Sequence, residues 1–129
     1  MPTAEQHLTK YRVNKRLLET DEMSIEKNSK HYEWIITVAF YSALHLIERE
    51  MDMNDEIPCN GTTDHKSRNE VIAKTARFRN IRAQYKCLAD ACWKARYEAG
   101  RMNKNDAQTA INNLSKIEEY LLNEIKQKD

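Results

Sequence analysis

The stretch that decides the fold is Tyr32–Glu48, which reads YEWIITVAFYSALHLIE. Apolar side chains fill almost every direction around a helix of this sequence, so its middle offers little polar surface. A helix that is apolar nearly all round belongs at the centre of a bundle. We therefore predict a central helix over residues 30–51, with the remaining helices packed around it.

The composition also favours helices. The 129 residues suit one domain, residues 1–129, and a chain of this size buries enough surface for a core without cross-links. Glycine and proline occur only twice each, which is too few for the turns that sheets and hairpins need. We predict an all-α, single-domain antiparallel helical bundle of about five helices.

Local patterns predict where the other helices lie. Thr3 and Gln6 form a capping box that starts the first helix. Residues 20–22 are predicted as a break and residues 52–63 as a loop, and further helices are predicted over residues 64–76, 81–97 and 105–126. The apolar side of the first helix is made by Leu8, Tyr11, Val13, Leu17 and Leu18. That of the fourth is made by Ile81, Tyr85, Leu88 and Cys92. That of the fifth is made by Ala107, Ile111, Leu114, Ile117, Leu121 and Ile125.

Hydropathy and cysteine usage indicate a cytoplasmic protein that does not enter the membrane. No apolar run approaches the roughly 20 residues of a membrane span, and the first residues lack the apolar core of a signal peptide. The cysteines Cys59, Cys87 and Cys92 are odd in number and form no Cys-x-x-Cys pair, which fits reduced thiols. We expect Cys87 and Cys92 to fill the core.

Charge is unevenly distributed although the net charge is only +1. Residues 1–64 hold 7 Lys/Arg against 12 Asp/Glu, residues 65–104 hold 11 against 3, and residues 105–129 hold 3 against 5. A basic middle suggests an anionic partner such as nucleic acid. The alternative is that these cations pair with the acidic ends inside the fold or simply form a solvated face.

His65 and Arg68 are the candidate catalytic residues. They stand three apart at the start of the third predicted helix, on one stripe with Ile72. In the functional interpretation Arg68 binds a phosphate and His65 is a general acid or base. In the structural interpretation they are a capping histidine and a salt-bridged arginine that close the bundle.

Tyr41 and His45 are candidate supporting residues on the central helix. They share a stripe with Trp34 and Val38. The alternative is that His45 is a hydrogen-bonded core or seam residue, and it gains functional weight only if it faces His65 and Arg68.

The segment before Arg96 and Tyr97 is a candidate nucleic-acid surface. Arginines, a lysine and aromatic residues alternate there, and such mixtures suit a surface that follows a phosphate backbone and stacks bases. The alternative is a solvated basic face with two core aromatics. The candidates for nucleic-acid binding are Arg77, Arg79, Arg82 and Lys86. Asn69, Arg96 and Tyr97 join Tyr41 and His45 as candidate supporting residues of the His65 and Arg68 site.

Several chemistries have no pattern in the sequence. No glutamate stands three residues before a histidine, as a di-iron bundle requires. Zinc spacing of cysteines and histidines and a glycine-rich phosphate loop are also missing. We therefore expect neither a metal nor a cofactor.

The order of motifs resembles the HEPN superfamily of small, often dimeric α-helical domains. The resemblance covers about residues 30–125. The motifs that carry it are Trp34 with the AFYSALHL run at 39–46, the DHKSRNE run at 64–70, Tyr85, and the ARY run at 95–97. It implies an antiparallel bundle with a polar cleft at a two-fold interface, hence a homodimer.

HEPN domains include metal-independent ribonucleases, nucleotide-binding proteins and partners of nucleotidyltransferases in toxin–antitoxin or defence pairs. The resemblance implies RNA or nucleotide binding, with a nucleotidyltransferase or antitoxin as a partner protein. Catalytic members carry an arginine, four to six residues, and then a histidine. Here Ala73, Lys74 and Thr75 stand where Arg68 would need that histidine. Whether this chain is a ribonuclease or a non-catalytic dimerisation and partner-binding module therefore stays open.

Overall fold

The computed structural model describes residues 3–27, 30–53, 65–97 and 102–128, with the side chains of 65–68 and 123–128 left aside. Every regular element in these ranges is helical. The elements are α1 (Ala4–Leu18), η1 (Asp21–Met23), α2 (Tyr32–Met53), α3 (His65–Lys74), η2 (Ala76–Ile81), α4 (Arg82–Tyr97) and α5 (Lys104–Lys128), where η denotes a 3₁₀ helix. The predicted all-α helical bundle is confirmed.

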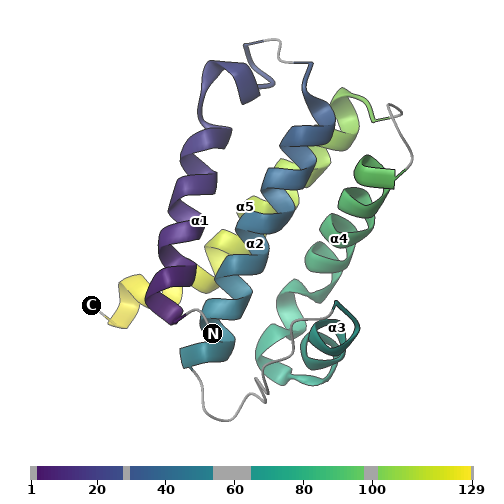
Figure 1. Cartoon of the computed structure of the whole chain (residues 1–129). Coiled ribbons are helices and arrows are strands. Elements are labelled where there is room, and N and C mark those ends of the chain that lie inside the picture. Colours follow the sequence, from purple (N-terminus) through teal and green to yellow (C-terminus); the bar gives the residue numbers. More distant parts are fainter. Residues whose placement is uncertain (1–2, 28–29, 54–64, 98–101, 129) are drawn as a thin grey trace.

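Helix α2 occupies the centre, as its sequence predicts. Figure 1 shows α1 and α4 on either side of α2 and α5 behind it, with successive long helices running in opposite directions. The short α3 lies beside the start of α4. Because three helices surround α2, its side chains are buried on most of its circumference, including Ile35, Ile36, Ala39, Phe40, Ala43, Leu44, Leu46 and Ile47.

The predicted capping box at the start of α1 is confirmed. The Thr3 hydroxyl accepts from the Gln6 amide, and the Gln6 side chain accepts from the Thr3 amide. The carboxylate of Asp52, near the end of α2, also accepts from the Ala4 amide at 2.6 Å. These bonds satisfy amides at the α1 N-terminus that have no partner within the helix. The Asp52 bond also fixes that end of α1 against α2.

Two expectations about packing are wrong, and one element lies largely between the predicted helices. Val13 and Leu17 are exposed, because the side of α1 that meets α2 carries Tyr11 and Leu18 instead. Cys87 is also exposed, and only Cys92 of the predicted pair is buried in the core. Residues 76–81 form a 3₁₀ helix, which places Phe78 and Ile81 in the core between α3 and α4.

The predicted stripes of α4 and α5 lie largely in one hydrophobic core. Ile81, Tyr85, Leu88 and Cys92 are buried, as are Ala107, Leu114, Ile117 and Leu121, while Ile111 is partly buried and the Ile125 side chain lies outside the described residues. None of the described helices is both long and apolar enough to cross a lipid bilayer.

Candidate functional site

A surface rich in arginine and aromatic groups lies where α2 meets the end of α4. Nη1 of Arg96 donates a hydrogen bond to the Tyr41 hydroxyl at 3.0 Å. The Arg96 guanidinium carbon lies 5.5 Å from the centre of the Tyr97 ring, and the Trp93 and Tyr97 ring centres are 5.3 Å apart. Both tryptophans and Tyr97 are strongly exposed: Trp34 by 64%, Trp93 by 59% and Tyr97 by 63%. We call Trp34, Tyr41, Trp93, Arg96 and Tyr97 the arginine–aromatic surface.

Two hollows join at Arg96 and make this surface continuous. Trp34 and Tyr41 line the hollow between α2 and α4. Trp93 and Tyr97 line the second hollow, together with Asn69 of α3. An arginine between the two supplies charge-assisted donors, while the rings on either side supply flat apolar faces.

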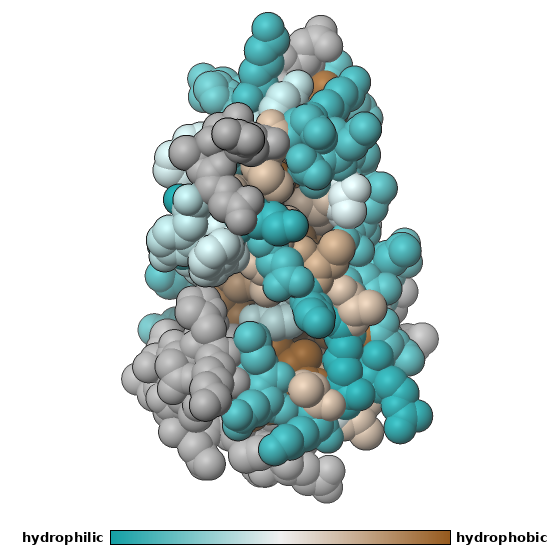
Figure 2. Space-filling model, turned by 90° about the vertical axis from the view of Figure 1, so that its right-hand side faces the viewer, coloured by the Kyte–Doolittle hydropathy of each residue, from teal (hydrophilic) through white to brown (hydrophobic). Residues whose placement is uncertain are grey.

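Asn69 brings α3 to the edge of this surface. Its exposed side chain lines the hollow beside Trp93, and it also lines a groove between α3 and α4 with Tyr85 and Lys86. Figure 2 looks onto the side of the molecule that lies to the right in Figure 1, where α4 runs, and shows apolar patches on a largely hydrophilic face. The predicted supporting residues Tyr41, Asn69, Arg96 and Tyr97 therefore lie along connected hollows.

The predicted catalytic residues His65 and Arg68 begin α3, and their side chains lie outside the described residues. Their backbone precedes Asn69 on the helix that borders the arginine–aromatic surface. That His65 and Arg68 act together in catalysis therefore stays a prediction.

Two of the predicted nucleic-acid-binding residues make contacts inside the fold. Nε of Arg77 donates to Oε2 of the buried Glu50 at 2.8 Å. Arg82 donates to the carbonyls of Ile72 and Thr75 at 2.8 and 2.9 Å, which satisfies acceptors at the end of α3. The other two, Arg79 and Lys86, are exposed. Part of the basic charge in this stretch therefore has a structural use.

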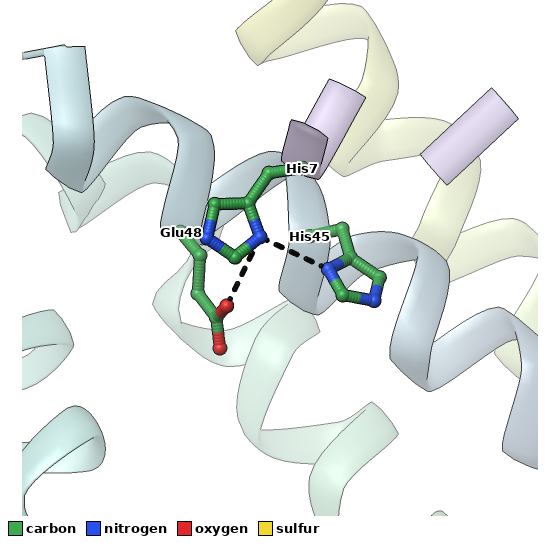
Figure 3. A group of neighbouring side chains, drawn as sticks. All are labelled: His7, His45 and Glu48. Atoms are coloured by element: carbon green, nitrogen blue, oxygen red, sulfur yellow. Dashed lines mark hydrogen bonds and ion pairs between the residues drawn. The ribbon is translucent and has the colours of Figure 1, made fainter. Parts of the chain in front are cut away.

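His45 faces α1 rather than the arginine–aromatic surface. Its Nδ1 lies 3.2 Å from Nδ1 of His7, and that atom of His7 lies 3.2 Å from Oε2 of Glu48 (Figure 3). His7 is buried, and His45 and Glu48 are partly buried. Imidazole and carboxylate groups are the donors that zinc uses in proteins, so this group is the set of described residues that offers metal ligands together.

The sequence carries no recognisable metal motif for this group, for an identifiable reason. Its residues come from two helices, 38 positions apart between His7 and His45. On α2 the glutamate follows the histidine by three residues, whereas the motif of a di-iron bundle has a glutamate three residues before the histidine. The signal available was that His45 and Glu48 share a helical face and that His7 lies on the inner face of the first helix.

Comparisons with known proteins add no relative. No protein-family model matches the chain, and no curated protein and no solved structure gives a significant match. The fold defines the class of protein as an all-α helical bundle, and the likeness to HEPN domains rests on the sequence motifs.

Proposed function

We propose that this protein is a HEPN-like domain that binds single-stranded RNA on the arginine–aromatic surface. The observation that carries the proposal is the position of Arg96, between the Tyr41 hydroxyl and the Tyr97 ring and flanked by two exposed tryptophans. Side chains that stack on bases beside an arginine that meets phosphates are the usual means of binding single strands. Asn69 adds an exposed amide to the same surface.

Intrinsic fluorescence tests the proposal directly, because Trp34 and Trp93 are the two tryptophans of the chain and both belong to the surface. Titration with a mixed-sequence single-stranded RNA at low salt is expected to quench this fluorescence to saturation. Trp34→Phe and Trp93→Phe then report which half of the surface the strand covers. Titration with a mononucleotide shows whether one nucleotide is enough to quench the tryptophan fluorescence.

Substitutions on the surface sharpen the test. Tyr97→Ala is expected to weaken RNA binding roughly 5- to 150-fold, equivalent to the stacking of one base. Arg96→Ala should weaken it as well, whereas Arg16→Ala, which removes an exposed arginine from α1, should have little effect. Equal affinities for the wild type, Tyr97→Ala and Arg96→Ala would rule out this surface as the RNA site.

Metal-independent RNA cleavage is a second part of the proposal, with His65 as acid or base and Arg68 as phosphate ligand. The support is that α3, which carries both residues, borders the surface through Asn69. Cleavage of labelled RNA in EDTA by the wild type but not by His65→Ala or Arg68→Ala is the expected result. RNA binding without cleavage would leave a binding protein and remove the enzymatic part.

Exposed Trp34, Trp93 and Tyr97 also favour a second candidate function, a dimerisation or partner-binding module. Tryptophan, tyrosine and arginine are the residues that dominate binding energy at protein interfaces. Sedimentation of the RNA-free protein over a range of concentrations tests for a homodimer, with Trp93→Ala expected to weaken it. Co-purification with a nucleotidyltransferase or antitoxin encoded by a neighbouring gene would identify a different protein partner for the same surface.

A further inference from the structure

The His7, His45 and Glu48 side chains form a group that RNA binding does not use. His45 and Glu48 lie one turn apart on α2, and His7 approaches them from α1 (Figure 3). The approach is fixed by packing, since the bond from the Ala4 amide to the Asp52 carboxylate holds the first turn of α1 against α2. His7 itself is only 7% exposed. Donor atoms from two helices are thus held near one point before any ligand arrives.

The ring proton of a neutral His7 does not satisfy both of its neighbours, His45 and Glu48, well. A neutral imidazole has one ring proton, so each nitrogen either donates or accepts. If Nδ1 of His7 carries the proton, it must share it between Nδ1 of His45 and Oε2 of Glu48, each 3.2 Å away. If it carries none, its lone pair faces the carboxylate. A cation at this point would instead accept electron pairs from all three atoms.

The spacing of the three atoms fits a transition-metal ion. A tetrahedral zinc ion with bonds of about 2.0–2.1 Å sets neighbouring ligand atoms about 3.3 Å apart. The two recorded separations are both 3.2 Å, and the donor atoms of the three residues all lie within 4.8 Å of one another. The His45 and Glu48 side chains are both partly exposed, whereas His7 is buried.

We propose that His7, His45 and Glu48 bind one Zn²⁺ ion, or a divalent ion of similar ligand preference, between α1 and α2. Two histidines and one glutamate are a donor set that zinc uses where it keeps a coordination position open. No other cysteine, histidine or carboxylate among the described residues joins the group. The ion therefore keeps at least one position for water or a small anionic ligand, and it ties α1 to the central helix.

The experiment uses the full chain, free of any affinity tag and treated with chelator. Cys59→Ser and Cys87→Ser are introduced as background changes, so that thiols do not compete for the ion. Calorimetric titration with Zn²⁺ is expected to give one ion per chain. Titration with Co²⁺ should give visible absorption bands of a low-symmetry site without the near-ultraviolet absorption of a thiolate ligand.

Glu48→Gln and His45→Asn are the decisive variants, since each changes a partly exposed side chain and the first also keeps its size. Each should weaken Zn²⁺ binding by more than about tenfold, the lower limit for losing even an outer partner of a metal site. His31→Gln removes an exposed histidine away from the group and should leave the affinity unchanged. A circular-dichroism spectrum of each chelated variant that matches the wild type shows that the helices are intact.

Zinc affinity unchanged in both Glu48→Gln and His45→Asn would overturn the proposal, and so would the absence of one-to-one binding in the background protein. RNA affinity is measured on the same samples with Tyr97→Ala as the reference. Because His7, His45 and Glu48 lie outside the arginine–aromatic surface, loss of zinc binding with RNA binding intact supports this site, independently of the proposed function.

Discussion

Tyr11 places a phenol in the core and pairs it with a carboxylate from the far end of the chain. Its hydroxyl donates to Glu118 of α5, which also accepts from Lys15 at 3.2 Å. Burial raises the pKa of Tyr11 above its ordinary value, and the hydrogen bond and negative charge of Glu118 raise it further. The folded state therefore retains the phenolic proton at pH values where the unfolded chain has lost it.

This pKa shift predicts a loss of stability in alkali. Below about pH 10, the ordinary pKa of tyrosine, both states are protonated and the Tyr11 contribution is complete. Above it the unfolded chain ionises first, so the free energy of unfolding falls by up to about 1.4 kcal/mol per pH unit. Urea unfolding at several pH values between about 9 and 11 should show a steeper fall for the wild type than for Tyr11→Phe. Parallel curves for the two proteins would contradict this origin of the pH dependence.

The two described cysteines should differ in reactivity. Cys92 lies in the core, and burial raises the pKa of its thiol, although a hydrogen bond with Thr37 and the charge of Arg96 act in the opposite direction. Cys87 is exposed. In a Cys59→Ser background we expect one thiol to react rapidly with a disulfide reagent and the other to react only as fast as the protein opens. Peptide mapping should assign the rapid site to Cys87, and rapid labelling of both would contradict the burial of Cys92.

Among the elements, η2 depends on a charged contact with α2. Glu50 is only 4% exposed and accepts from Arg77 at 2.8 Å, with Arg49 a further 3.7 Å contact. Phe78, the next residue along η2, is completely buried. The ion pair therefore fixes the segment that delivers Phe78 to the core and joins α3 to α4.

Arg77→Ala should reduce stability more than it reduces RNA binding. Loss of the arginine leaves a buried carboxylate with its weaker partner, at an expected cost of roughly 1–3 kcal/mol in the free energy of unfolding. The Arg77→Ala/Glu50→Gln double variant should recover part of that loss, because it removes the charge that needs a partner. Denaturant unfolding measures both effects. A stable Arg77→Ala protein that has lost RNA affinity would instead make Arg77 a binding residue.

At the scale of the whole molecule, periodicity predicted the long helices but not every contact between them. The continuous apolar character of α2 was enough to place it at the centre. The stripe of α1 was misleading, because apolar residues cover more of its surface than α2 can bury, and Val13 and Leu17 remain outside. The 3₁₀ turn of η2 leaves no periodic signal of its own, so residues 77–80 were left between two predicted helices.

For the candidate sites, too, individual residues could be predicted from the sequence but the contacts between helices could not. Tyr41, Arg96 and Tyr97 could be chosen from the sequence because each stands in a recognisable motif, but the contact between Arg96 and Tyr41 spans 55 positions and needed the fold. The meeting of His7 with His45 depends on how far α1 is shifted along α2. No local pattern encodes that register, which the contact between the Ala4 amide and the Asp52 carboxylate helps to fix.

The salt dependence of the proposed RNA binding tests how the charges of the whole molecule are used. For single strands the logarithm of affinity falls with the logarithm of salt by about 0.7 for each phosphate neutralised. If all 11 basic residues of 65–104 met phosphates, the slope would be close to −8. Arg77 and Arg82 already bind acceptors within the fold, and a surface centred on Arg96 calls for a much shallower slope. Fluorescence titrations at several salt concentrations measure it.

Two variants then separate charge from stacking. Arg96→Ala should lower the affinity and make the salt dependence shallower. The magnitude of the slope should fall by about 0.7, the value for one phosphate contact. Tyr97→Ala should lower the affinity at every salt concentration and leave the slope unchanged, because stacking on a ring releases no counterions. A wild-type slope near −8, or a Tyr97→Ala protein that loses slope rather than affinity, would mean that RNA follows a broad basic face and not the arginine–aromatic surface.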